Sequence, residues 1–471
     1  NSKIMATTIT QQPLYNRLTA GQEIIFAVTN PTITNTYTLV KIIAEVYVSD
    51  TPISVITDTP VGIFKSTPNN EGTAFFDFAP VIESYVKGDN LSGDNSTYKG
   101  GLVTLIGKLP IHLIDYYSIN NNVLRFVKIR FKTEYLNTAT PAAIVTDGTQ
   151  ALSNTLNVFN GYLKYSDRLS SNTVGFGFND SKFDANPNLA PGDKAGTILS
   201  NAPLTQFANP TDYGTMAVIS DESGVLGVDK IIISYYGDAG VISSETVFRT
   251  LANGAFDTNS GDTKDQILFI GCFPGNIRNW STEFNSLLIL GTVKYYIISV
   301  YNSTGSVIFN GMIVNLLCPN TKGFEPIRVT WLNQWGVWDY YTFNMKSTKS
   351  ISTKGTTYQQ LSGTWGGTTY RTDGFKGGKK TFRVNATEKI TMNTDFVSET
   401  ETEWFEEFIN SPEAYVLEGY QSDLSLPALN NYVTPIRLTT SSYTFKTVAN
   451  DKLIQYTFEV EKSKTLRTQS I

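Results

Sequence analysis

Residues suited to catalysis are scarce in this chain of 471 residues, which contains a single histidine, His112. Histidine is the usual general base near neutral pH, so a Ser-His-Asp or Cys-His arrangement would have to use it. His112 lies in a short apolar stretch, and no Gly-x-Ser-x-Gly elbow occurs elsewhere to pair with it. We therefore expect a structural histidine and a chain that is not an enzyme.

Cysteine is almost as rare, with only Cys272 and Cys318. Two distant thiols and one histidine cannot fill a tetrahedral zinc shell, and no glycine-rich phosphate loop is complete. We therefore expect no metal site and no cofactor. Two cysteines in so long a chain are not a disulfide framework, although a single bridge between them stays open.

Charge and long hydrophobic runs are limited as well. Charged residues make up 17% of the chain, and the net charge is −5; globular proteins average roughly 25% charged residues. The acidic balance argues against nucleic acid as a partner, and the basic cluster at residues 376–380 is expected to be a solvated loop. No apolar run approaches the ~20 residues of a membrane helix, and residues 1–18 show no signal peptide, so we expect no membrane insertion.

The residues that are abundant favour β-structure. Thr, Tyr and Asn suit half-buried strands and turns. Apolar and polar residues alternate with period two in several runs, as in strands with one face in a core. The clearest runs are residues 41–48, 123–132, 327–331 and 454–461. We predict a mainly β, multidomain fold of β-sandwich or β-barrel type.

Only one or two short helices are predicted. Glu399–Asn410 follows Ser398, and Glu401 stands at the capping-box position. A second helix is expected to begin at Pro80, with Val81, Ile82, Tyr85 and Val86 on its inner side.

Segments rich in Gly, Asn, Thr and Ser predict long loops at residues 87–101, 137–154, 179–214 and 347–380. We expect the last two to reach a neighbouring subunit. The domains expected from these loops are an N-terminal β-sandwich at residues 5–101, one or two middle β domains at 102–323, and a C-terminal β domain at 324–471.

Acidic and aromatic residues offer the remaining candidates for a site. Glutamates crowd the helix near residue 399, and Asp77, Glu83 and Asp339 lie beside aromatic or apolar residues. Helix-dipole compensation and turn capping explain them, yet a pair of acids could also hydrolyse glycosides. Clustered aromatics can form a sugar platform or an interface. The interface candidates are Trp331, Trp335, Trp338, Asp339, Tyr340, Tyr341 and Trp365.

Two segments carry a resemblance. Residues 75–86 read Phe-Phe-Asp-Phe-Ala-Pro-Val-Ile-Glu-Ser-Tyr-Val, and residues 335–343 read Trp-Gly-Val-Trp-Asp-Tyr-Tyr-Thr-Phe. Both resemble segments of virion structural proteins of tailed phages that infect Bacteroidetes and marine bacteria. The resemblance implies a tail, neck or baseplate component in a ring or fibre attachment, where repeated subunits with one type of interface close into rings.

We therefore expect a structural or assembly protein of a virus particle, located in the virion. Its expected partners are copies of itself in an oligomer of at least three subunits and other virion proteins. An alternative is a module or adhesin that binds host-surface glycan, and a third hypothesis is a two-carboxylate carbohydrate-active enzyme.

Overall fold

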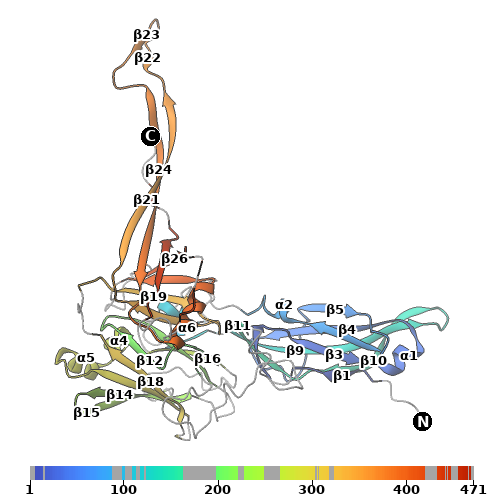
Figure 1. Cartoon of the computed structure of the whole chain (residues 1–471). Coiled ribbons are helices and arrows are strands. Elements are labelled where there is room, and N and C mark those ends of the chain that lie inside the picture. The colour runs from blue at the N-terminus through green and yellow to red at the C-terminus, as the bar shows by residue number, and fades with distance from the viewer. Residues whose placement is uncertain are drawn as a thin grey trace. The chain divides into compact units, whose positions relative to one another are not determined.

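The computed structural model describes residues 6–13, 16–86, 98–100, 109–112, 117–120, 123–162, 198–220, 228–248, 266–302, 305, 307–317, 323–418, 432–440, 442, 444–446, 454–464 and 466–467. In these residues the strands form six sheets, accompanied by five α-helices (Figure 1). The predicted mainly β, multidomain fold is confirmed.

Contacts divide the chain into two compact units. Unit 1 consists of Asn1–Leu317, Leu332–Asp339 and Tyr420–Leu426, and unit 2 of Cys318–Trp331, Tyr340–Gly419 and Pro427–Ile471. The change at Leu317 lies near the boundary expected at residue 323. The sheets do not follow the boundary expected at residue 101, because strands from residues 124–162 pair with strands from the first 50 residues. Such non-local pairing leaves no local signal in the sequence.

The N-terminal part of unit 1 holds two sheets. A six-stranded sheet has the order β2-β11-β9-β4-β5, with β10 paired to β9, and a three-stranded sheet has the order β1-β3-β6. The strands are β1 (Thr8–Gln11), β2 (Arg17–Gly21), β3 (Ile25–Thr29), β4 (Thr38–Ser49), β5 (Gly62–Ser66), β6 (Thr73–Asp77), β9 (Leu124–Asn137), β10 (Ala143–Leu152) and β11 (Leu156–Tyr162).

The predicted inner faces of β4 and β9 are confirmed. Ile42, Ala44 and Val46 of β4 are fully buried, as are Val127, Ile129 and Phe131 of β9. They belong to one core with residues of β2, β3, β6 and β11. Each fully buried aliphatic or aromatic side chain contributes about 1.5–3 kcal/mol, so this face stabilises the pairing of the two strands.

The remainder of unit 1 holds two further sheets, of order β12-β18-β17-β14-β15 and β13-β16-β8-β7. Their strands are β7 (Tyr98–Gly100), β8 (Tyr117–Asn120), β12 (Thr205–Ala208), β13 (Thr215–Ser220), β14 (Val228–Gly237), β15 (Gly240–Phe248), β16 (Gln266–Gly271), β17 (Tyr295–Asn302) and β18 (Val307–Leu316).

Unit 2 is built on an eight-stranded sheet of order β20-β19-β25-β26-β27-β24-β21, with β28 paired to β24, and a separate two-stranded β22-β23 sheet. The strands are β19 (Ile327–Leu332), β20 (Trp338–Phe343), β21 (Thr348–Gln360), β22 (Gly363–Trp365), β23 (Tyr370–Thr372), β24 (Gly378–Asn393), β25 (Ala414–Leu417), β26 (Val433–Leu438), β27 (Thr457–Lys462) and β28 (Leu466–Arg467).

One predicted strand of unit 2 differs from expectation. Ile327, Val329 and Trp331 of β19 are buried as predicted, but Arg328 and Thr330, expected on a wet face, are buried too. Arg328 is accommodated because its guanidinium lies 5.2 Å from the centre of the Tyr340 ring and donates a 2.9 Å hydrogen bond to Thr342. A buried charge needs such partners.

The helices are α1 (Pro31–Thr36), α2 (Ala79–Ile82), α4 (Pro274–Trp280), α5 (Thr282–Ile289) and α6 (Glu399–Asn410), with a 3-10 turn η1 (Pro110–His112). The prediction of α6 is confirmed to the residue, with the complete capping box of Ser398 and Glu401. The helix at Pro80 is confirmed, but Tyr85 is 38% exposed rather than inward, because the helix ends at Ile82.

Two predicted loops are strands instead. Residues 137–154 contain β10, and residues 347–380 contain β21, β22, β23 and the start of β24. β21 is exposed along most of its length, so polar residues occupy both of its faces and the alternation that marks a half-buried strand is missing. β10 does alternate between exposed and half-buried residues, but its half-buried side includes the polar Asp147 and Thr149, which hides the pattern in the sequence. Of the other two predicted loops, residues 87–97 and 179–197 lie outside the described residues, and β7 and β12 occupy part of the rest.

Candidate interaction site

Most of the predicted interface residues lie in the interior. Trp331, Trp335, Trp338, Asp339 and Tyr340 are at most 5% exposed, whereas Trp365 is 65% exposed. Tyr341 is half-buried. Six of the seven therefore take part in packing, and Trp365 is the one that presents its ring to solvent. Whether any of them contacts a partner stays a prediction.

Trp331 anchors the aromatic core of unit 2. Its ring lies 5.0 Å from that of Trp404 and 4.9 Å from that of Phe408, both on α6. Tyr341 packs against Phe405 of the same helix at 4.9 Å. Burial, and then the charge of Glu401, raises the pKa of Tyr341, so this phenol stays neutral.

The turn between β19 and β20 explains Trp335, Trp338 and Asp339. The Asn333 side chain accepts hydrogen bonds from the backbone N–H groups of Trp335 (3.0 Å) and Val337 (3.2 Å). The Trp335 indole donates to Asn201 (3.2 Å). Asp339 accepts a 2.7 Å hydrogen bond from the Ser200 hydroxyl. These polar contacts fix the turn inside unit 1.

The candidate catalytic groups also have structural roles. His112 Nδ1 accepts a 3.0 Å hydrogen bond from the Leu109 backbone N–H in the 3-10 turn. Asp77 accepts 3.0 Å bonds from the N–H groups of Ile24 and Ala79, at the start of α2. Glu399 and Glu401 stand in the first turn of α6, where carboxylates offset the helix dipole.

Two findings concern metals and membranes. Across the described stretches of the chain, no three His, Cys, Asp or Glu side chains gather closely enough to hold a metal ion. No helix there is long and apolar enough to traverse a lipid bilayer. Cys272 is buried, and Cys318 lies outside the described residues, so the bridge between them stays open.

The feature of unit 2 that packing does not explain is a long hairpin, which we call the arm (residues 348–393). In Figure 1, β21 and β24 run as a two-stranded ribbon with β22 and β23 at its far end. β24 pairs with β27 through residues 389–393 and with β28 through Asn385 and Ala386. From Val384 to Gly378, the partner of β24 in the described residues is β21 alone. We call residues 354–385 the outer arm.

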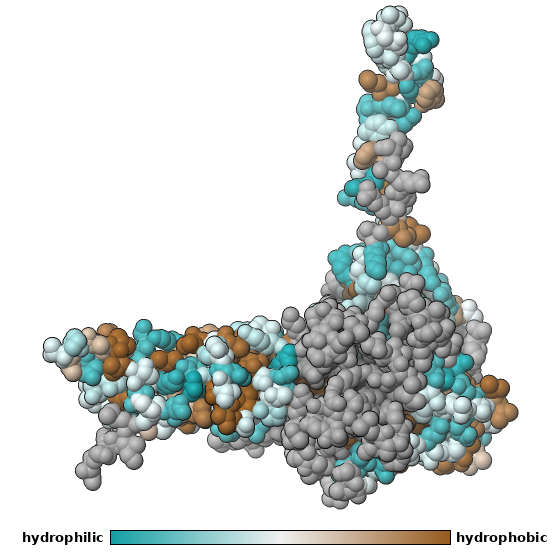
Figure 2. Space-filling model, turned by 180° about the vertical axis from the view of Figure 1, so that it is seen from behind, coloured by the Kyte–Doolittle hydropathy of each residue, from teal (hydrophilic) through white to brown (hydrophobic). Residues whose placement is uncertain are grey.

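The outer arm exposes large apolar side chains. Leu361, Trp365 and Phe375 are 76%, 65% and 75% exposed, and Tyr370 and Phe382 about half. Trp365 and Tyr370 are register partners in the β22-β23 pair. Figure 2 shows hydrophobic and hydrophilic residues next to each other along the arm. Exposed aromatics of this kind are typical of binding surfaces.

Local contacts shape the end of the arm. The Thr364 hydroxyl donates a 2.8 Å hydrogen bond to Asp373, and the Lys376 ammonium donates to the same hydroxyl. At Gly363 a Cβ atom would lie 2.0 Å from the Arg371 carbonyl oxygen, so only glycine allows β22 and β23 to approach this closely. The exposed end is thus held in a defined shape.

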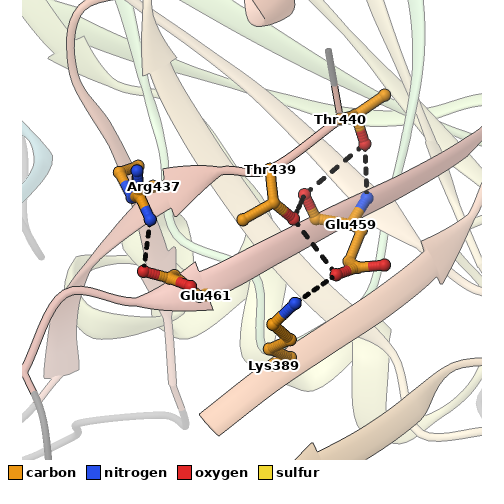
Figure 3. A network of polar contacts seen from close by, with 6 residues as sticks. All are labelled: Lys389, Arg437, Thr439, Thr440, Glu459 and Glu461. Carbon is orange, nitrogen blue, oxygen red and sulfur yellow. Dashed lines mark hydrogen bonds and ion pairs between the residues drawn. The ribbon is translucent and has the colours of Figure 1, made fainter. Parts of the chain in front are cut away.

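The base of the arm is a network of ion pairs, drawn in Figure 3. Lys389 of β24 binds Glu459 at 3.0 Å, and Arg437 binds Glu461 at 2.7 Å. The hydrogen bond and charge of Lys389 hold the pKa of Glu459 below its usual value. These contacts join β24, β26 and β27 on the polar side of the sheet.

The sequence analysis placed Trp365 in the candidate site and expected residues 347–380 to reach a neighbouring subunit, but it predicted a loop there and missed the strands of the arm. One usable signal was present. Residues 348–360 contain many Thr residues with Ile351 and Tyr358 and no proline, and a glycine-rich stretch follows them. β-branched and aromatic residues followed by glycines predict a strand that enters a turn, even where both faces are polar.

Comparison with known proteins assigns the chain to no family. No protein-family model matches the chain, and no curated protein matches it. Among solved structures it is similar to a cryo-EM reconstruction of E. coli alpha-2-macroglobulin in its native conformation, with a TM-score of 0.17 and 10% identity over 82% of this chain and 22% of that one. The chain thus spans about a fifth of that protein, and at this TM-score the likeness supports no argument.

Proposed function

We propose that this chain is a structural subunit of a virus particle, in a tail, neck, baseplate or fibre attachment, that contacts its neighbours through the arm. Its partners are copies of itself in an oligomer of at least three subunits, and other virion proteins. The proposal makes the chain a non-enzymatic building block located in the virion. The observation that carries it is the outer arm, a two-stranded extension that exposes large aromatic side chains.

Physical chemistry explains why such an arm needs a partner. A two-stranded hairpin is at best marginally stable by itself, since it has no core of its own. The outer arm nevertheless places Leu361, Trp365 and Phe375 in water, where each loses the benefit of burial. An edge strand as long as β21 (13 residues) is also a template for pairing with another chain. A neighbouring subunit would bury the exposed apolar side chains and pair with the edge strand.

Two measurements test this proposal. The first is mass spectrometry of purified virus particles, in which we expect this chain; its absence would end the viral assignment. The second compares the full chain with an arm-shortened variant in which Asn-Gly joins Thr353 to Ala386, two register partners that such a turn can connect. We expect a defined oligomer of the full chain and loss of that oligomer in the variant.

A second function is favoured by one observation. Trp365 and Tyr370 expose neighbouring aromatic rings at the end of the arm, which is the chemistry of a sugar platform. On a glycan array, a host-glycan-binding module would give a signal that Trp365→Ala removes. Trp338, another of the tryptophans predicted at an interface, is 2% exposed and cannot stack on a sugar while it is buried.

A further inference from the structure

Charge is distributed unevenly between the outer arm and the rest of the chain. The outer arm contains six basic residues and one acidic residue, a net charge of +5. The whole chain carries −5, so the remainder carries −10. Positive charge is thus concentrated on the arm of an otherwise acidic protein, and the basic segment 376–380 belongs to it.

Cations at the base of the arm are neutralised. Lys349 binds Glu325 at 2.9 Å, and Lys389 binds Glu459 at 3.0 Å. Lys462 contacts both Glu388 (3.3 Å) and Glu418 (3.0 Å). Burial lowers the pKa of Lys462, but hydrogen bonds and charge from these two carboxylates raise it above its usual value. The positive charges of these three lysines at the base of the arm are therefore balanced by carboxylates of the same chain.

Of the six cations in the outer arm, Lys376 lies 3.7 Å from Asp373, but four others have no such partner among the described residues. In the described part of the chain, no carboxylate lies within ion-pair distance of Lys354, Lys379, Lys380 or Arg383. Lys380 donates a hydrogen bond to the Phe375 carbonyl oxygen (2.9 Å), which leaves its charge unbalanced. The contrast between base and outer arm shows where positive charge remains available.

The strand register gathers three of these cations on one face. Lys354 pairs with Asn385, and the next pair on that face joins Thr356 to Arg383. Beyond the bulge that follows Thr356, Tyr358 pairs with Lys380 on the same side. The Tyr358 ring contacts that of Phe382 at 6.4 Å. We call Lys354, Tyr358, Lys380 and Arg383 the basic face of the arm.

We propose that the basic face of the arm binds the carboxylate-bearing surface of a second copy of this chain. The inference rests on the proposed function and names the partner for this part of the arm. Charge complementarity supports a second copy, because +5 on the arm meets a remainder of −10. Opposite charge steers association and fixes the register of the contact, while the aromatic rings supply the buried area.

The test uses the full chain with three glutamates at Lys354, Lys380 and Arg383 (K354E/K380E/R383E). A matched control, K41E/K346E/K464E, reverses three exposed lysines outside the arm and changes the net charge equally. Sedimentation is measured at about 0.05, 0.15 and 1 M NaCl, where the screening length falls from above 10 Å to about 3 Å. We expect reversal on the basic face to weaken assembly at least about tenfold, and high salt to weaken wild-type assembly, with little effect of the control.

Cross-linking identifies the partner directly. A zero-length carbodiimide joins lysines to carboxylates that touch, and an assembly of isotopically light and heavy chains separates contacts between copies from contacts within one. We expect Lys354 and Lys380 to link to Asp or Glu of the other isotope. Links within one copy alone would overturn the inference.

The outcomes separate this inference from the proposed function. If K354E/K380E/R383E assembles like the wild type while the arm-shortened variant does not, the basic-face inference is wrong and the proposed function stands. A wild-type chain that stays monomeric at every salt concentration contradicts both. Tight binding of heparin or DNA by the basic face, lost in the triple variant and without assembly, would assign the face to another polyanion and overturn the inference.

Discussion

Two tryptophans of unit 2 make a matched pair for testing which residues build the fold and which remain available for contacts. Trp331 is 0% exposed and Trp365 is 65% exposed, although sequence reasoning placed both in the same candidate interface. Substitution by alanine should therefore affect the stability of unit 2 very differently at the two positions. Trp331→Ala should destabilise unit 2, and Trp365→Ala should leave its stability unchanged.

The magnitude follows from the packing around Trp331. Its ring touches Trp404 and Phe408 at about 5 Å, so truncation leaves a large cavity beneath α6. Replacement of a buried tryptophan by alanine costs about 3–5 kcal/mol. No hydrogen-bond partner of the Trp331 indole N–H occurs in the described residues, so the substitution leaves no former partner unpaired. The predicted loss of stability therefore comes from packing alone. A domain is stable by only about 5–15 kcal/mol in total.

Differential scanning calorimetry of the full chain is the assay. For a unit of this size, 1 kcal/mol shifts the melting temperature by about 2–4 °C, so Trp331→Ala should lower the transition of unit 2 by roughly 10 °C. The transition of unit 1 serves as an internal control. Trp365→Ala should stay within about 0.5 kcal/mol of the wild type. A Trp331→Ala protein that melts like the wild type, or a Trp365→Ala protein that loses several degrees, would refute this reasoning.

Three further predictions concern other parts of the fold. Ser398→Ala removes the cap of α6 and should cost about 1 kcal/mol in chemical denaturation; an unchanged midpoint would contradict the capping box. Gly336→Ala should prevent native folding of unit 1, because φ is +70° and a Cβ would lie 1.5 Å from the Asn160 carbonyl oxygen, whereas Gly374→Ala, with nothing within 4 Å, should melt normally. Burial raises the pKa of Glu45, but hydrogen bonds from its basic and phenolic neighbours on β4 and β9 outweigh burial and hold the pKa below its usual value. This stability is present above pH 4.5 and is lost as pH falls through the folded-state pKa, so Glu45→Gln should flatten the acid dependence of stability, and an unchanged profile would be contrary to expectation.

The elements predicted correctly from the sequence are those whose apolar residues recur at regular spacing within one short segment and face a core. β4 and β9 each bury an alternating apolar set (Ile42, Ala44 and Val46; Val127, Ile129 and Phe131), and α6 has both an apolar stripe and a capping box, so the sequence pattern predicted all three elements. The strands of the arm were missed, and residues 347–380 were predicted as a loop, because both faces of β21 are exposed to water and an alternating pattern needs a buried face. β10 was missed for a different reason, because its half-buried side includes the polar Asp147 and Thr149.

The candidate site was predicted less well for a different reason. Aromatic clustering marks either a core or a contact surface, and the sequence alone does not separate the two. Trp335 and Trp338 are both buried. Asn333 shapes the turn locally, whereas the partner of the Trp335 indole is Asn201, which lies far away in the sequence. Trp365 lies on the β22-β23 pair, with which no further strand of the described residues pairs, and its side chain is exposed.

The central claim, that the chain assembles through its arm, is tested most directly by sedimentation velocity of the full chain and the arm-shortened variant under identical conditions. The variant keeps the ion pairs of Lys389 and Arg437 at the base of the sheet, and circular dichroism confirms whether it folds. The account predicts a defined oligomer of at least three subunits for the full chain and a folded monomer for the variant. Equal oligomeric states of the two proteins, whether both monomeric or both assembled, would contradict it.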